Sequence, residues 1–182
     1  MEEYLDIWNS EGQPTGETCL KDIAHQKGLF HPTVHVWFYT PAPALLLQKR
    51  SFLKQTYPEF WDVSVAGHVS AGESILEGAL REVKEEIGLN IQEIDLLPID
   101  IRKNINRFEN GVIDCEFQHV FLVQLKVDVS KLEIQNNEVD EVRLFTFEEL
   151  QNCMQQMHPN YNIVPADMSY YQFMMDTVLK FL

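Results

Sequence analysis

Gly67 to Leu89 reads GHVSAGESILEGALREVKEEIGL, and this segment decides how the chain folds. Its apolar residues recur every three or four positions, which predicts an amphipathic helix because an α-helix turns about 100° per residue. We expect the helix to span residues 75–87, with Ser74 as N-cap and Glu77 completing a capping box. The apolar stripe that this helix would bury consists of Leu76, Leu80, Val83 and Ile87.

Three glutamates gather on the other side of the predicted helix. Glu82 lies three and four positions before Glu85 and Glu86, so the three carboxylates share one face. Taken alone, such residues more often form a solvated helix face. Each like-charged pair costs an isolated helix about 0.2 to 0.5 kcal/mol, so we expect a bound cation to offset the repulsion. Mg²⁺ or Mn²⁺ fits best, because hard cations bind carboxylate oxygens and often bridge them to substrate phosphates.

The defined residues of this segment have the spacing of a known motif. Five residues separate Gly67 from Glu73, seven follow before Arg81-Glu82-Val83, and single residues precede Glu85-Glu86 and Gly88-Leu89. The pattern resembles the Nudix box at every defined position, and the flanks extend the resemblance over about residues 4–150. On these residues the chain is identified as a member of the Nudix hydrolases.

This resemblance implies an α+β Nudix fold, in which a mixed β-sheet lies between helices in an α/β/α arrangement. It also implies hydrolysis of a diphosphate linkage in a small molecule by water that Mg²⁺ or Mn²⁺ activates. The site residues that it assigns are the metal ligands Glu82, Glu85 and Glu86 with the Gly67 carbonyl, and the structural pair Glu73 and Arg81. The general base stays open between Glu86 itself and a carboxylate outside the box, such as Glu116 or Glu138.

A second resemblance concerns the residues before the box. Residues 48–51 and 61–68 look like the Nudix subgroup closest to isopentenyl diphosphate isomerase. The active cysteine of that enzyme stands immediately before its Gly-His pair, where this chain has Ala66, and a methyl group cannot transfer protons. The isomerase also departs from the Nudix box, so hydrolysis is favoured. Isomerisation remains an alternative because other isomerase metal ligands have counterparts here, namely His31, His68, Asp114 and Glu116. A binding module without turnover is the other alternative.

Cations near the box are candidates for contacts with substrate phosphate. The isomerase resemblance favours Arg50 and Lys54 for this role, although both are also explained as ordinary surface cations. His68 adjoins Gly67 and is expected either to contact phosphate or to pack. We do not expect a zinc site among the histidines, because their spacing matches no zinc motif and no paired cysteines accompany them.

The remaining periodicity predicts one domain over residues 1–182, with an N-terminal extension of about residues 1–30. We expect strands at residues 4–8 and 15–19 as a first hairpin, at 34–39 and 44–49 as a second, and at 63–65, 91–101, 112–127 and 141–147. Helices should begin near residue 146 and cover residues 169–182. The apolar stripe of this last helix would form either core or the contact of a homodimer.

Composition narrows the functional classes. The formal charge of −14, from 28 acidic and 14 basic residues, argues against broad contact with nucleic acid but allows a small diphosphate ligand. Three cysteines without close spacing favour a reducing cytoplasm. No apolar run approaches the length of a membrane span, and the N-terminus is unlike a secretory signal, so we expect the protein in the cytoplasm. The substrate stays open among nucleoside phosphates, nucleotide sugars, dinucleotides, and thiamine-type or prenyl diphosphates.

Overall fold

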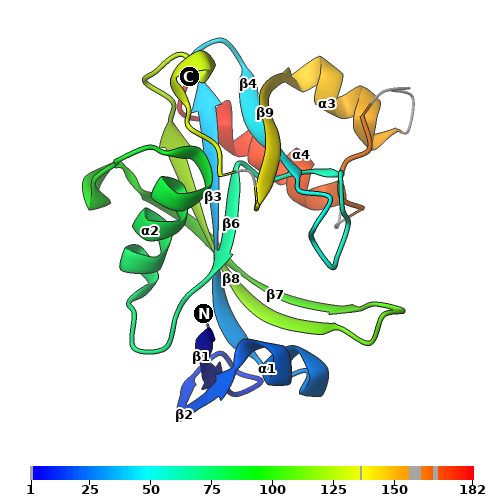
Figure 1. Ribbon diagram of the computed structural model, residues 1–182. Coiled ribbons are helices and arrows are strands. Elements are labelled where there is room, and N and C mark those ends of the chain that lie inside the picture. The colour runs from blue at the N-terminus through cyan, green and yellow to red at the C-terminus, as the bar shows by residue number, and fades with distance from the viewer. Residues whose placement is uncertain (1, 136, 156–160, 166–167) are drawn as a thin grey trace.

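A mixed sheet forms the centre of the computed structural model, which describes residues 2–135, 137–155, 161–165 and 168–182. Within these residues seven strands join in one sheet (Figure 1), with β5, β4, β3, β8 and β7 in that order, β6 paired with β3 and β9 paired with β4. The strands are β3 (His31–Thr40), β4 (Ala44–Arg50), β5 (Trp61–Asp62), β6 (Val65–His68), β7 (Leu97–Arg107), β8 (Ile113–Gln124) and β9 (Val139–Thr146).

The sheet splits beside β3. Along one edge β3 runs parallel to β8 over nine residue pairs, from His31 opposite Glu116 to Tyr39 opposite Gln124. Along the other edge β3 pairs with β4 only at the turn, through residues 39–40 and 44–45, and then with β6 through residues 33–36. The predicted second hairpin therefore exists only at its tip, because β4 leaves β3 and pairs with β9 instead.

Ser64 holds the two halves of the split sheet together. Its buried hydroxyl accepts a hydrogen bond from the Phe38 amide at 2.8 Å and donates one to the Leu46 carbonyl. The two hydrogen bonds of this one side chain thus connect β3 to β4 where the strands do not pair directly. The expected strand over residues 63–65 is wrong for the same reason, since β5 ends at Asp62, β6 begins at Val65, and the residues between them cross the split.

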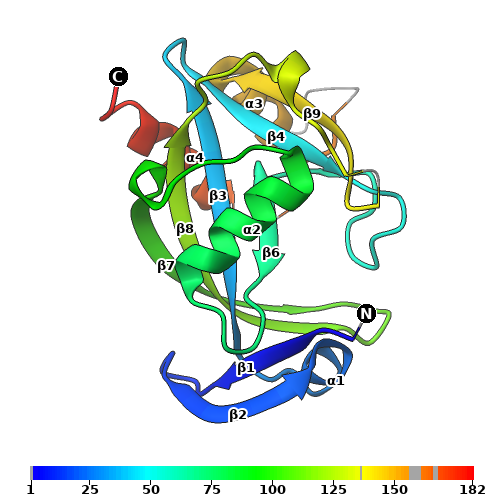
Figure 2. The same cartoon turned by 60° about the vertical axis from the view of Figure 1, so that its left-hand side comes forward.

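Helices cover both faces of the sheet, as expected for an α/β/α arrangement. Helix α2 (Ile75–Ile87) packs Ala79, Val83 and Ile87 against Val34 and Val36 on one face. Helix α4 (Met168–Val178) packs on the other face, and α3 (Phe147–Met154) follows β9. Figure 2 shows α2 across the front of the sheet and α4 behind it. No helix within the described part of the chain has the length and apolar character needed to span a membrane.

The C-terminal helix contributes to the core. Tyr170, Met174 and Val178 lie at helical spacing and are buried together with Trp37 and Leu122 of the sheet. The sequence allowed this apolar stripe to form either core or a homodimer contact. The structure shows it as part of the core.

The N-terminal residues form a small unit of their own at one end of the sheet (Figures 1 and 2). Strands β1 (Tyr4–Trp8) and β2 (Pro14–Leu20) make the expected hairpin, and α1 (Lys21–Lys27) follows. The sequence did not indicate α1, because Ala24 is its one buried residue and such a helix has no apolar period. Leu5, Ile7 and Ala24 form the core of this unit.

Four further expectations are wrong in detail. The last helix ends at Val178, so residues 179–182 lie outside the helix that was expected over residues 169–182. Residues 91–96 do not extend β7, because Glu93–Asp95 form a 3₁₀ turn in which the Asp95 carboxylate accepts the Gln92 amide at 3.0 Å. Helix α2 has the predicted bounds and capping box, but Leu76 is 36% exposed. Glu86, expected on the acidic side, is buried instead, because the end of α2 lies against β4 and β6.

Replacing Ser64 by Ala should lower the free energy of unfolding by about 1 to 3 kcal/mol, because a buried amide and carbonyl would lose their shared partner. Urea unfolding followed by circular dichroism measures this. Ser10→Ala on the exposed N-terminal turn is the control and should change stability by less than about 0.5 kcal/mol. Equal stability of the two variants would show that Ser64 does not join the sheet halves.

Candidate active site

Helix α2 presents its three glutamates in different surroundings. The side chain of Glu85 is 51% exposed, whereas that of Glu82 is 12% exposed and Glu86 as a whole is 2% exposed. Ser74 at the N-terminus and Gly88, in left-handed conformation at the C-terminus, set the length of the helix. The acidic group therefore extends from solvent at Glu85 into the protein at Glu86.

Gly67 and Glu82 are in direct contact. A Cβ atom on Gly67 would lie 2.0 Å from the Cδ atom of Glu82 and 2.3 Å from one carboxylate oxygen. Only glycine leaves room for the carboxylate against the backbone of β6 at this point. The predicted ligand from the loop and the predicted ligand from the helix thus lie side by side.

Arg81 joins the loop to the helix. Its Nε and Nη2 atoms each donate to the carboxylate of Glu73 at 2.9 Å, and Nη2 also donates to the His68 carbonyl at 2.8 Å. Nη1 donates to Glu82 at 2.6 Å and to Glu85 at 3.0 Å. These hydrogen bonds raise the pKa of the guanidinium, which remains charged. The expected pair of Glu73 and Arg81 is formed, and Arg81 additionally fixes two of the three helix carboxylates.

Glu86 accepts hydrogen bonds at the inner end of the acidic group. Gln48 Nε2 donates to it at 2.9 Å and the Ala66 amide at 3.1 Å. Burial raises the pKa of Glu86 to about 8 and also raises that of Glu82, because both charges lose solvent. The Gln48 Oε1 atom beside them is buried without a partner in the described structure. These closely spaced and largely buried oxygen donors fit a hard divalent cation such as Mg²⁺ or Mn²⁺.

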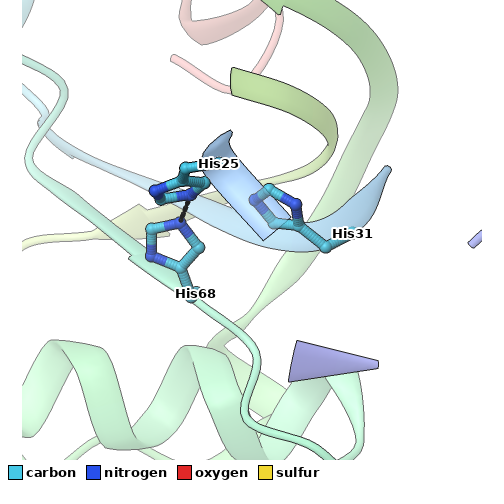
Figure 3. A group of neighbouring side chains, drawn as sticks. All are labelled: His25, His31 and His68. Carbon is cyan, nitrogen blue, oxygen red and sulfur yellow. Dashed lines mark hydrogen bonds between the residues drawn. The ribbon is translucent and has the colours of Figure 1, made fainter. Parts of the chain in front are cut away.

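A second group of ligand atoms lies on the opposite face of β6. His25 of α1, His31 of β3 and His68 of β6 bring their ring nitrogens within 4.8 Å of one another (Figure 3). The Nε2 atoms of His25 and His68 are 3.1 Å apart. This is a hydrogen-bond distance, and it is close to the roughly 3.4 Å that separates two nitrogen ligands of a tetrahedral metal.

His31 is held in the orientation of a ligand. Its Nδ1 atom faces the Leu29 carbonyl at 2.8 Å, and its buried Nε2 atom has no partner among the described residues. A hydrogen bond from Nδ1 to a backbone carbonyl is the usual way to orient a metal-binding imidazole.

Charge around the histidines favours their neutral form. Burial, together with His31 and Lys21, lowers the pKa of His25 to about 4, and burial also lowers the pKa of His31 and His68. Neutral imidazole is the form that binds metal. Asp114 adds a carboxylate oxygen 3.7 Å from His25 Nε2, and its pKa rises to about 6 through burial and the neighbouring Glu116. The mixed nitrogen and oxygen donors suit a transition metal.

Sequence spacing gave no indication of this histidine group, since its members come from three elements that meet only in the fold. The isomerase resemblance did mark His31, His68, Asp114 and Glu116, and the structure brings them together. Glu116 faces His31 across the parallel pairing of β3 and β8 and accepts a hydrogen bond from Gln118 at 2.8 Å. His25 carried no such signal.

The other predicted residues already have protein partners. Arg50 donates to Asp62 at 3.0 Å and to the carbonyl and hydroxyl of Thr56 at 3.1 Å. Lys54 forms an ion pair with Glu138. A substrate phosphate would therefore have to share Arg50 with Asp62 and Thr56, or displace Glu138 from Lys54.

Comparison with known proteins agrees with this geometry. A family model of the NUDIX domain matches residues 29–166. The chain belongs to the Nudix family. This Nudix protein is 39% identical over 142 residues to an uncharacterised Nudix hydrolase of Clostridium acetobutylicum, covering 76% of this chain and 67% of the relative. It is 32% identical over 120 residues to the isopentenyl-diphosphate Delta-isomerase of Burkholderia multivorans, covering 66% of each chain.

The fold is also that of a solved NUDIX domain, that of Shewanella oneidensis NrtR, which superposes with a TM-score of 0.59 at 15% identity, covering 83% of this chain and 88% of that one. A crystal structure of a Deinococcus radiodurans protein superposes with a TM-score of 0.64 at 19% identity, covering 88% of this chain and 92% of that one. The mixed sheet between helices, with an N-terminal hairpin added, is therefore the Nudix fold. As a Nudix hydrolase, the protein is a phosphohydrolase that acts on a pyrophosphate-containing substrate.

Gly67→Ala should destabilise the protein and reduce its activity, because the new methyl group would displace the Glu82 carboxylate. The double variant Gly67→Ala, Glu82→Ala removes the atoms that collide. Its melting temperature should therefore equal that of Glu82→Ala alone, while activity stays low. Additive losses of melting temperature would show that the contact does not constrain Gly67.

Proposed function

We propose that this Nudix hydrolase depends on divalent metal and hydrolyses the diphosphate linkage of a small organic diphosphate. The observation that carries the proposal is the buried acidic group at Gly67. Glu82 and Glu86 lose solvent there, Arg81 forms an ion pair with Glu82 but not with Glu86, and Gln48 Oε1 has no partner in the described structure. Mg²⁺ or Mn²⁺ held by Glu82, Glu85, Glu86 and the Gly67 carbonyl would compensate this charge.

A bound divalent cation would lower the pKa of water and neutralise charge on the phosphate oxygens. The protein's own residues supply the positioning. Arg81 holds Glu82 and Glu85 in place, and its bonds to Glu73 and the His68 carbonyl fix the loop that carries Gly67.

Two carboxylates are suited to accept a proton from the attacking water. Glu116 lies outside the ligands proposed for this Mg²⁺ or Mn²⁺ site, and burial raises its pKa above the usual range, so it is more basic than a surface glutamate. Glu86 is the other candidate, in a form that is not bound to metal. Glu138 is less suited, because Lys54 already occupies its carboxylate. Lys54 and Arg50 border the site as cations that a substrate phosphate could recruit.

The histidine group supports a second metal site in the same protein. His25, His31 and His68, with Asp114 and Glu116, would hold a transition metal at the positions where the isomerase resemblance places such ligands. This group is the observation that favours isomerisation as the second candidate. Ala66 speaks against it, because the position beside Gly67 carries no group that can transfer a proton.

Glu85→Gln should lower kcat by about a hundredfold, because it removes a metal ligand and leaves the exposed helix surface otherwise unchanged. Phosphate and pyrophosphate release from a panel of nucleoside and prenyl diphosphates with Mg²⁺ or Mn²⁺ measures this. Lys84→Gln, one residue away on the same helix, is the matched control and should retain activity. Full activity of the Glu85 variant would contradict its role, and isomer formation by the wild type would favour the second candidate.

Calorimetric titration with Mn²⁺ should detect about two ions per chain. His25→Ala should remove one of them, while Glu85→Gln should weaken the other. His119→Ala is the control, because His119 lies on the other face of β8 and stacks edge-on against Trp8, away from the histidine group. If His25→Ala leaves the stoichiometry unchanged, the histidine group does not bind metal.

A further inference from the structure

The N-terminal unit of β1, β2 and α1 lies against the loop that leads from β6 into α2. The family model begins at residue 29, whereas these three elements lie within residues 4–27. Leu5 of β1 forms an isolated antiparallel bridge with Ser70 of the loop, and Figure 2 shows β1 beneath it. Residues from outside the matched domain therefore contact the loop that precedes the helix glutamates.

Two consecutive amides of this loop donate to β1. The Ala71 amide donates to the Tyr4 carbonyl at 2.8 Å, and the Gly72 amide donates to the Asp6 carboxylate at 2.9 Å. Hydrogen bonds to a carboxylate are roughly twice as strong as those between neutral groups. Packing does not restrain this point of the loop, since Gly72 is exposed and a Cβ atom on it would meet nothing within 4 Å in the described structure. Asp6 therefore restrains a residue that is otherwise open to solvent.

The restrained turn leads directly to Arg81. The Glu73 amide donates to the Ser70 carbonyl, and the Ser70 amide donates to the Glu73 carboxylate, both at 3.0 Å. The same carboxylate accepts two hydrogen bonds from Arg81, which also donates to two of the proposed metal ligands on α2. A displaced turn would therefore displace Glu73 and, through Arg81, the carboxylates that would hold the metal.

Helix α1 contacts the other end of the loop. His25 Nε2 lies 3.1 Å from His68 Nε2, and the His68 carbonyl accepts a hydrogen bond from Arg81 at 2.8 Å. Lys21 ties α1 to the start of the chain, because its amide donates to the Glu3 carbonyl at 2.9 Å and its Nζ atom to the Glu3 carboxylate at 2.8 Å. The N-terminal unit thus contacts the loop at both ends, beside each of the two loop groups that bind Arg81.

We propose that Asp6 is a positioning residue for the metal site on α2. It fixes the turn at Gly72, so that Glu73 and Arg81 hold the helix glutamates at the separation that a divalent cation requires. This inference rests on the proposed function, because it needs the helix glutamates as metal ligands. It assigns to the N-terminal extension a part in catalysis that the acidic residues of the motif do not supply by themselves.

Calorimetric titration of the full chain with Mn²⁺ tests this role at the site that Glu85→Gln weakens. Asp6→Ala should weaken Mn²⁺ binding there by about five- to tenfold, since hydrogen bonds that orient metal ligands contribute to affinity. Asp6→Asn keeps a side-chain oxygen that can accept the Gly72 amide and should bind almost as the wild type does. Glu17→Ala removes an exposed carboxylate from the neighbouring strand β2 and is the matched control, with unchanged affinity.

Hydrogen exchange of the Arg81 Nε–H group, followed by ¹⁵N NMR on the metal-free chain, separates positioning from general stability. Asp6→Ala should speed this exchange about tenfold, whereas a contact that only anchors the N-terminal unit would change the melting temperature and the amides of β1 but not Arg81. Wild-type Mn²⁺ affinity in Asp6→Ala, or an equal loss in Asp6→Asn, overturns the inference. If the wild type binds no Mn²⁺, the proposed function fails, and the exchange of Arg81 alone then decides whether Asp6 positions the loop.

Discussion

The four-residue pairing of β6 with β3 is the constraint on which the site depends. Side chains alternate along a strand, so β6 presents Gly67 to α2 and His68 to the opposite face. The first contact brings Glu82 against the backbone, and the second brings His68 to His25 and His31. One short strand thus places an oxygen-donor group and a nitrogen-donor group on its two faces. Space for β6 exists only because β4 departs from β3, a split that Ser64 bridges.

The electrostatics of both groups favour the cations that we propose for them. Buried carboxylates such as Glu86 and buried neutral imidazoles such as His31 are unfavourable unless they are hydrogen-bonded or coordinate a metal. Part of this need is met by Gln48, the Ala66 amide and the Leu29 carbonyl. These same hydrogen bonds orient the side chains, so the protein would hold both groups in place for the metal that we propose.

Differences from the isomerase relatives lie around Ala66. The isomerase resemblance marks His31 and His68 of the histidine group, yet the position of the proton-transferring thiol carries a methyl group here, and the Nudix box is complete. The surface next to Ala66 is polar as well, through Thr33 and His35. A similar set of side chains thus surrounds a position with different chemistry, which agrees with a hydrolase.

Local sequence by itself determined the Nudix helix, its bounds and its capping box, because these depend on residues within one turn of each other. It also indicated Glu82, Glu85 and the pair of Glu73 and Arg81 through their spacing. Only the tertiary structure decided that Glu86 is buried, that Lys54 is paired with Glu138, and that His25 joins His31 and His68. Those features arise from contacts between residues distant in sequence, and such contacts leave no period or spacing from which they could be predicted.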